Sequence, residues 1–282
     1  MDNNLQTMSS DIDNIVATFG SDESAFMELT GQASMPKSEG LSRLNINYDT
    51  ETEDGETLTR GDWKMMYHGE MVFAKEILIK PILRTFEWSI FDAEQGVFSS
   101  KSVQKPTMSG DFPDTEGGNK CGRLSQDEED KLKDDDPLKL KSRSAVCNQV
   151  LYSKVSGKFR KANGEEIEIS EHPAVAYFKR SGFLPIRNFI DSLTRQKKIM
   201  QKCWISLKTD KKKRGSVTYF VPVPTLSSET DILDEDKELM KKFAETVKAH
   251  NKSVLEQSRE STKLETNKSD ESLADDFNAA AV

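Results

Sequence analysis

Long apolar runs are missing from this sequence. No stretch comes near the roughly 18 consecutive apolar residues that a membrane-spanning helix requires. The beginning of the chain is polar and acidic, whereas a secretory signal starts with basic residues and continues with an apolar segment. We therefore expect neither a membrane protein nor a secreted one.

Cysteine is scarce as well. The chain has three cysteines, Cys121, Cys147 and Cys203, and this odd number at wide spacing fits a reducing compartment better than a disulfide framework. A structural zinc site normally contains two cysteines about two to four residues apart, and the sequence has no such pair. We expect a cytoplasmic protein, in the host cytoplasm if a phage encodes it, with neither a metal nor another cofactor.

The sequence also lacks the motifs of nucleotide-dependent and hydrolytic enzymes. It contains no phosphate-binding glycine loop, no dinucleotide-binding glycine turn and no Gly-x-Ser-x-Gly elbow. We therefore expect no enzymatic activity. One alternative stays open: Glu87, Asp92 and Glu94 lie near Lys101 in the sequence, and clustered carboxylates hold Mg²⁺ in metal-dependent nucleases.

The composition indicates that only part of the chain folds into a domain. Hydrophobic residues make up 35% of its 282 residues and charged residues 31%, too little apolar material for one core to enclose the whole length. We predict a flexible acidic N-terminal arm (1–40), a β-rich domain (41–225) with a long loop (104–143), a C-terminal helix (226–258) and a disordered acidic tail (259–282).

Charge is distributed unevenly along the chain. Residues 1–140 carry 14 basic and 28 acidic side chains, a net charge of −14. Residues 141–220 carry 18 basic and 6 acidic side chains (net +12), and residues 221–282 carry 8 and 14 (net −6). A basic segment between acidic ones indicates a binding site for a polyanion. Chance clustering of charges on a solvated surface is the alternative.

Residues 41–225 show the mixture of alternating and continuous apolar residues that is typical of strands. Strands are predicted at 44–48, 63–67, 71–79, 82–91, 96–103, 146–155, 174–178, 203–207 and 217–223. Pro81 cannot donate to a sheet ladder, so it is expected to mark a strand end or a bulge. We predict an α+β fold, mainly antiparallel β, forming an oligonucleotide-binding-like barrel or meander with one or two peripheral helices and disordered acidic tails.

Helices and one hairpin complete the predicted domain. Apolar residues recur at helical spacing over 185–200, and a second helix begins near Ser228 or Asp231, whose side chains can cap it. A short helix from Ser125 is expected within the long loop. The basic turn 208–215 joins the last two strands into a hairpin.

Basic and aromatic residues occur together repeatedly in the basic segment, as at 158–161, at 177–180 and around Trp204. Single-stranded nucleic acid is bound by cations that neutralise phosphates and by flat rings on which bases stack. Some of these rings must belong to the core, since alternate residues of a strand face inward. The candidate binding residues are Lys158, Arg160, Lys161, Lys179, Arg180, Arg187, Arg195, Lys197, Lys198, Trp204, Lys208, Lys211, Lys212, Lys213, Arg214 and Tyr219.

Near its end the sequence reads Leu273-Ala274-Asp275-Asp276-Phe277-Asn278. Here it resembles bacterial and phage single-stranded DNA-binding proteins, which join a β-rich core of the oligonucleotide-binding type to an acidic tail with aspartates and a terminal phenylalanine. In this chain five residues follow Phe277. The resemblance implies that Asp275, Asp276 and Phe277 bind partner proteins. The order of elements over 41–225 is also similar to that of phage replication proteins.

These observations lead to one functional expectation. The protein binds single-stranded DNA non-specifically during phage or mobile-element replication or recombination, and its acidic tail recruits replication or recombination proteins. A structural or interaction protein, such as a virion component, is the second possibility, and the Mg²⁺-dependent nuclease is the third. Salt-dependent binding of oligo(dT) would distinguish the first from the second.

Overall fold

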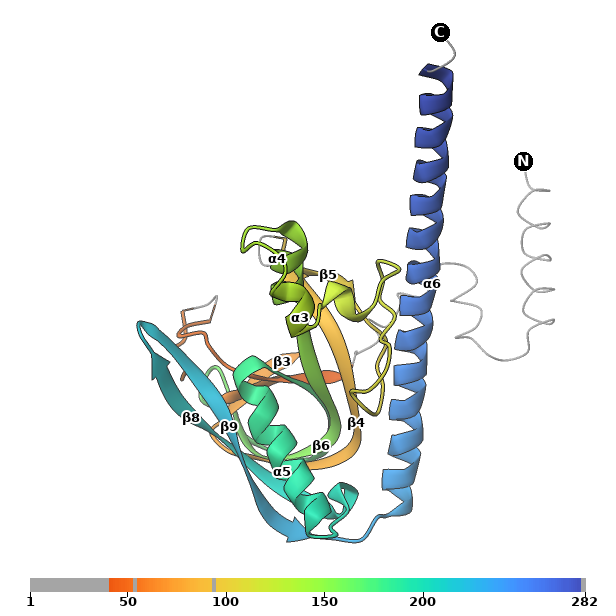
Figure 1. The fold of residues 1–282 in the computed structure, drawn as a ribbon. Helices are drawn as coiled ribbons and strands as arrows, with labels where there is room; N and C mark the ends of the chain where they lie inside the picture. Colours follow the sequence, from red (N-terminus) through yellow and green to blue (C-terminus); the bar gives the residue numbers. More distant parts are fainter. Residues whose placement is uncertain (1–40, 53–54, 93–94, 280–282) are drawn as a thin grey trace, which may run out of the picture. The chain divides into compact units, whose positions relative to one another are not determined.

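The computed structural model describes residues 41–52, 55–92 and 95–279, with side chains up to Lys263 (Figure 1). The predicted N-terminal arm lies outside the described residues. Within them, nine strands form one sheet in the order β3-β2-β1-β7-β6-β4-β8-β9, and β5 pairs with β4. In the part of the chain that is described, no helix is both long enough and apolar enough to cross a membrane.

Five of the strands close into a barrel. They are β1 (Ser42–Ile46), β2 (Trp63–Tyr67), β3 (Glu70–Ala74), β6 (Val146–Lys161) and β7 (Glu166–Lys179). The ring closes because β3 pairs with β6 as well as with β2. β1 and β7 run parallel and the other pairs of the ring are antiparallel, so the predicted fold class, α+β with an oligonucleotide-binding-like barrel, is confirmed.

The remaining strands extend the sheet outside the barrel. They are β4 (Ile77–Asp92), β5 (Val97–Lys101), β8 (Cys203–Arg214) and β9 (Val217–Glu229). The predicted strands 71–79 and 82–91 are divided differently in the structure: residues 71–74 belong to β3, and β4 continues from Ile77 through Pro81 to Asp92. The expected irregularity at Pro81 is a bulge, because the register between β4 and β6 shifts there.

β6 belongs both to the barrel and to the outer part of the sheet. Residues 146–156 pair with β4, whereas Arg160 and Lys161 pair with β3. Between these two stretches Gly157 has a φ of 151°, next to a register shift with β7. Glycine adopts this conformation without the steric cost that a side chain would add, so β6 can change partners there.

The barrel interior is filled by apolar side chains from alternate strand positions. Trp63, Met65 and Phe159 are almost completely buried in it. Trp63 also donates a hydrogen bond from Nε1 to the carbonyl oxygen of Leu207 (3.0 Å), which satisfies its one polar atom and fixes β8 against the barrel.

β9 is the last strand at one end of the sheet. Pro222 and Pro224 lie within it, opposite Thr209 and Leu207 of β8. Proline has no N–H group. Because the two prolines are two residues apart, both leave the same edge of β9 without a donor, which is typical of an edge strand.

α5 (Phe183–Arg195) covers one end of the barrel and buries Ile186, Ile190 and Leu193 in its core, as the helical spacing of apolar residues over 185–200 predicts.

The long loop contains three short helical segments, η1 (Lys120–Gly122), α3 (Gln126–Glu129) and α4 (Pro137–Ser144). The short helix expected from Ser125 is α3, which begins with a capping box between Ser125 and Glu128.

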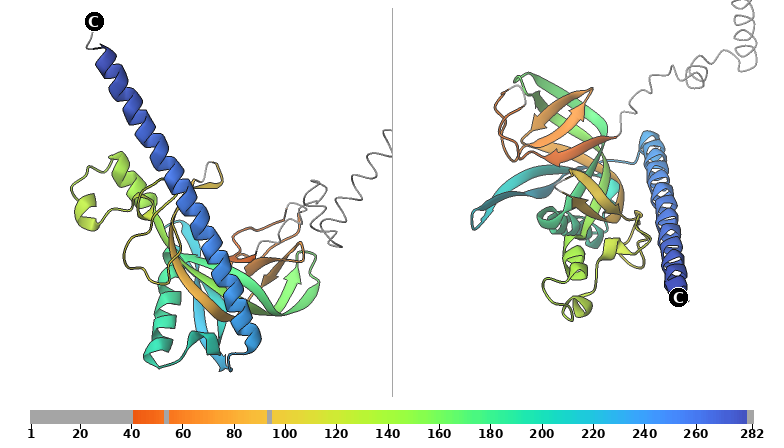
Figure 2. Two further views of the ribbon diagram at one scale, coloured as in Figure 1. Left: turned by 90° about the vertical axis from the view of Figure 1, so that its right-hand side faces the viewer. Right: turned by 90° about the horizontal axis from the view of Figure 1, so that it is seen from above.

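α6 (Asp234–Ala279) runs along the outside of the sheet and is longer than expected (Figure 1, Figure 2). We predicted a helix over 226–258 followed by a disordered tail, whereas the described backbone stays helical to Ala279. The residues after Pro224 include neither glycine nor proline, so nothing in the local sequence breaks the helix. The scarcity of apolar residues after Ser258 predicts that this part of the helix packs against little else, and it does not by itself prevent helix formation.

The first turn of α6 is fixed to the sheet by a buried ion triad. Asp236 contacts Lys80 of β4 through Oδ2 and Lys154 of β6 through Oδ1, each at 2.7 Å, and all three side chains are buried. The N–H of Leu233 also donates to Asp236 Oδ2 (3.0 Å). Burial alone would raise the pKa of Asp236, but these ion pairs and hydrogen bonds lower the pKa to about 2.

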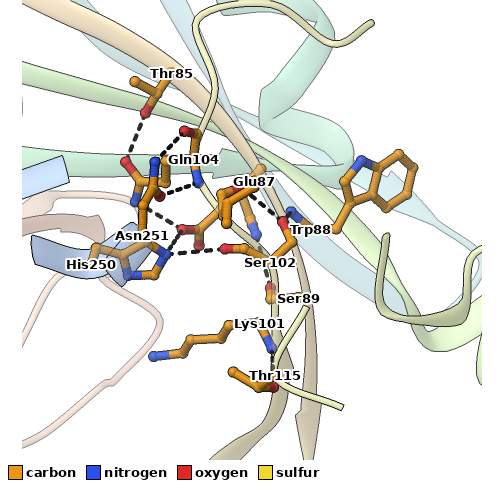
Figure 3. A network of polar contacts seen from close by, with 12 residues as sticks. Thr85, Glu87, Trp88, Ser89, Lys101, Ser102, Gln104, Thr115, His250 and Asn251 are labelled. Atoms are coloured by element: carbon orange, nitrogen blue, oxygen red, sulfur yellow. Dashed lines mark hydrogen bonds and ion pairs between the residues drawn. The ribbon is translucent and has the colours of Figure 1, made fainter. Parts of the chain in front are cut away.

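Glu87 of β4 is at the centre of a second contact with α6 (Figure 3). Gln104 Nε2 donates to Glu87 Oε2 (2.8 Å), and His250 Nε2 of α6 lies 3.7 Å from the same oxygen. Asn251 accepts from the backbone N–H of Gln104 (2.6 Å) and donates to its carbonyl oxygen (2.9 Å). Burial raises the pKa of Glu87, although the charge of His250 opposes the shift.

The ion triad predicts a strong effect of Asp236→Asn on stability. The substitution leaves Lys80 buried without a counter-charge and Lys154 with only the exposed Glu171, so we expect the free energy of unfolding at neutral pH to fall by about 3 kcal/mol in urea titrations. Because the carboxyl has a lower pKa in the folded state than its ordinary 3.8, its contribution is present above about pH 4 and is lost as pH falls toward 2. Asp234→Asn, on an exposed carboxylate, is the control and should change little.

Glu87→Gln should alter the pH dependence of stability in the opposite sense. A carboxyl whose pKa is raised in the folded state costs stability as pH rises above its unfolded value near 4.5. Glutamine cannot ionise and still accepts the hydrogen bond from Gln104. The variant should therefore lose less stability than the unaltered protein between pH 4.5 and 7, measured by urea unfolding across that range. An identical pH profile would contradict this assignment, and Glu245→Gln on the exposed face of α6 is the control.

Candidate functional site

The structure distributes the predicted binding residues over four places. Lys158, Arg160 and Lys161 lie at the end of β6, and Lys179 and Arg180 lie where β7 ends. Arg187, Arg195, Lys197 and Lys198 belong to α5 and the turn after it. Trp204, Lys208, Lys211, Lys212, Lys213, Arg214 and Tyr219 belong to the β8–β9 hairpin, which projects from the barrel (Figure 1).

Six of these cations form ion pairs within the protein. Arg160 contacts the buried carboxylate of Asp62 at 2.9 Å and also donates to Thr59. The other five cations and their partners are Lys161 with Glu70 and Glu165, Arg187 with Asp191, Lys198 with Glu229, Lys208 with Glu76, and Lys212 with Asp210. A phosphate would have to displace these carboxylates, so such residues are weaker candidates than unpaired cations.

Trp204 does not fall clearly on either side of its strand. Its side chain is half-buried, and the residue stands opposite Ser228 of β9, next to a register shift between the two strands. The buried residues on either side of it, Cys203 and Ile205, belong to the barrel core. Trp204 is therefore a weaker stacking candidate than a ring that stands clear of the core.

A row of alternating cations and rings lies on the outer face of the sheet, and we call it the cation–aromatic strip. Its members are Arg43, Tyr177, Lys179, Phe91, Phe98 and Lys101. Arg43 Cζ lies 4.6 Å from the centroid of the Tyr177 ring, Lys179 Nζ lies 5.9 Å from that of Phe91, and Lys101 Nζ lies 4.3 Å from that of Phe98. The two phenylalanine rings meet edge to face at 5.2 Å.

The strand register explains why these residues meet. Lys179 of β7 stands opposite Asn148 of β6, which in turn stands opposite Glu87 of β4. On the next strand Lys101 stands opposite Ser89 of β4. Directly opposed residues share one face of a sheet. The strip therefore lies on the face where Glu87 contacts α6, beside the area that α6 covers.

The cations of the strip have no carboxylate partner. Among the described residues, Arg43, Lys101, Lys179 and the neighbouring Arg180 form no ion pair. Burial and the like charges of Arg180 and Arg43 lower the pKa of Lys179. An anion beside Lys179 would relieve this repulsion, so the strip is suited to binding negative charge.

A groove lies between the β8–β9 hairpin and the end of the barrel. Phe220 of the hairpin packs on Gly61, where a Cβ atom would come within 2.5 Å of its ring, and Thr209 Oγ1 donates to the carbonyl oxygen of Gly61 (2.6 Å). Tyr48 meets Phe220 edge to face at 5.7 Å. The groove encloses about 370 Å³, and Tyr177 and Lys179 of the strip are among its lining residues.

Only one side of the hairpin faces the groove. Lys211 pairs with Phe220 and Lys213 with Thr218, so these two lysines share the face of Phe220. The alternate positions of β8, Lys212 and Arg214, pair with residues of β9 on the opposite face. The predicted turn over 208–215 is wrong in its bounds, because β8 continues to Arg214 and only residues 215–216 form the turn. The structure thus divides the basic cluster into two pairs, one on each face of the hairpin.

Several members of this surface were missed by sequence reasoning. Arg43, Tyr48, Phe91, Phe98 and Lys101 all precede the basic segment and come from a part of the chain with a net charge of −14. The negative net charge of that part of the chain conceals the two basic residues among them, Arg43 and Lys101. One signal was available, since Phe91 and Phe98 flank a turn between predicted strands, and side chains beside a turn are often accessible. Phe91 is 49% exposed.

The structure gives the other candidate sites less support. Glu87 of the proposed acidic cluster is buried and hydrogen-bonded to Gln104, and Glu94 lies outside the described residues. Among the described residues no group of three or more His, Cys, Asp or Glu side chains is placed to hold a metal ion. Asp275, Asp276 and Phe277 lie on the helical backbone of α6, and their side chains are outside the described part.

Comparisons with known proteins identify no relative of this chain. No protein-family model, no curated protein and no solved structure matches it. The site is therefore interpreted from its own geometry and charge.

Proposed function

We propose that the protein binds single-stranded DNA without sequence specificity and without catalysing a reaction, in phage or mobile-element replication or recombination. The observation that carries this proposal is the cation–aromatic strip, in which unpaired cations alternate with aromatic rings. Proteins that bind single strands combine cations that follow the phosphates with rings on which successive bases stack. The resemblance of the C-terminal sequence to phage and bacterial proteins supports the biological setting.

The exposure of Phe91, beside the half-buried Phe98, favours a single strand over a duplex. Phe91 and Phe98 lie on the hairpin formed by β4 and β5, next to Lys101 and Lys179. Rings of this kind can stack on bases only when the bases are unpaired and accessible. Duplex reading usually places a helix in the major groove. α5 instead buries its apolar face in the barrel core.

The same geometry favours binding without sequence preference. Stacking on Tyr177, Phe91 or Phe98 uses the flat surface that every base has, and contacts to phosphates carry no sequence information. We therefore expect similar affinity for oligonucleotides of different sequence, with a strong dependence on salt.

The decisive experiment compares two double variants that remove equal charge. Lys101→Gln with Lys179→Gln removes two cations of the strip. Arg195→Gln with Lys197→Gln removes two cations that form no ion pair within the described part of the chain and lie at the far end of α5, a helix about 18 Å long. Fluorescence anisotropy with labelled oligo(dT) across a salt series is the measurement. The strip variant should bind roughly tenfold more weakly. The slope of the logarithm of its binding constant against the logarithm of the salt concentration should be shallower by about 1.4. The control should change much less, and equal losses in both variants would count against the strip.

The two faces of the hairpin provide an independent prediction. Lys211→Ala with Lys213→Ala alters the face that the hairpin turns toward the groove, and Lys212→Ala with Arg214→Ala alters the opposite face. We expect the first pair to weaken oligo(dT) binding several-fold more than the second at the same ionic strength, because only the first lies along the path of the strand. Equal affinities of the two variants would show that the hairpin contributes only through its net charge.

A further inference from the structure

The groove has an aromatic wall that is open to solvent. Tyr48 is 46% exposed, and its edge-to-face contact with Phe220 means that the two rings are not stacked on each other. Leu44 and Ile46 of β1 and Pro222 of β9 supply apolar lining. A flat, apolar group that enters this groove can therefore lie against Tyr48 while it leaves water.

The rim of the groove is positively charged on one side. Lys64 is neutralised by Asp49 at 2.5 Å, whereas Lys179, another lining residue, forms no ion pair among the described residues. The site thus presents an apolar, aromatic slot next to one unneutralised cation. A ligand that complements both features has a flat ring joined to an anion.

Contacts within the protein hold the walls of the groove in place. The Phe220 ring occupies the space that a side chain at Gly61 would need, and the Thr209 hydroxyl is bonded to the Gly61 backbone. These contacts hold the β8–β9 hairpin against the loop that contains Gly61, beside the groove. A preformed site loses less conformational freedom on binding than one that must be ordered by its ligand.

We propose that this groove is a subsite for one unpaired nucleotide, which places its base against Tyr48 and its phosphate beside Lys179. The proposal rests on the proposed function and deepens it, because it assigns one nucleotide of the bound strand to an enclosed position and leaves the others on the open strip. The volume of about 370 Å³ is in the lower part of the range of small-molecule pockets, roughly 300–1,000 Å³.

The test uses the full chain and oligo(dT) that carries one 2-aminopurine, a base whose fluorescence falls when it stacks on an aromatic ring. Tyr48→Ala removes the wall, and Ser181→Trp fills the groove from an exposed lining position without changing any charge. Tyr219→Ala is the matched control, because Tyr219 pairs with Lys212 on the face of the hairpin turned away from Phe220. Tyr48→Phe should retain stacking.

We expect Tyr48→Ala and Ser181→Trp each to weaken binding roughly fivefold to a hundredfold and to diminish the quenching, while Tyr219→Ala and Tyr48→Phe bind like the unaltered protein. Unaltered affinity and quenching in Ser181→Trp would overturn the subsite and leave the proposed function standing, even if Tyr48→Ala fails to fold. Failure of the unaltered protein to bind oligo(dT) at all would overturn the proposed function and the subsite together.

Discussion

The barrel and the outer strands are joined through β6, and most of the features described above depend on this strand having two sets of partners. Its first eleven residues pair with β4, its end pairs with β3, and β7 lies along its other edge. Gly157 allows the change of partner. Because β4 is held on the barrel in this way, the row through Lys179, Asn148 and Glu87 crosses three strands, which brings the strip and α6 onto one surface.

Local sequence patterns predicted much of the fold. β2 was predicted with its observed ends, Pro81 was expected at a break or bulge, and Ser125 was expected to begin a short helix. These features depend on neighbours in the chain, such as alternation, a missing N–H or a capping side chain. The closure of the barrel depends on the pairing of β3 with β6, which are about 90 residues apart, and no local pattern encodes that contact.

The candidate site was less predictable for the same reason. Charge in a window of sequence does not distinguish Arg160, which is held by buried Asp62, from Lys179, which is surrounded by like charges. Arg43 meets Tyr177 only because β1 lies parallel to β7, and Lys101 is brought to the same face by β5. Cross-strand pairing thus decides which cations are available to a ligand, and a count of basic residues cannot show this.

Pro222 and Pro224 have a consequence for how the molecules behave in a crowded solution. A projecting two-stranded hairpin exposes one edge to other molecules, and an unpaired row of N–H and C=O groups there is a template for intermolecular pairing. The two prolines in β9 remove donors from the middle of this edge. The hairpin can therefore extend its lysines away from the barrel while its edge remains a poor starting point for aggregation.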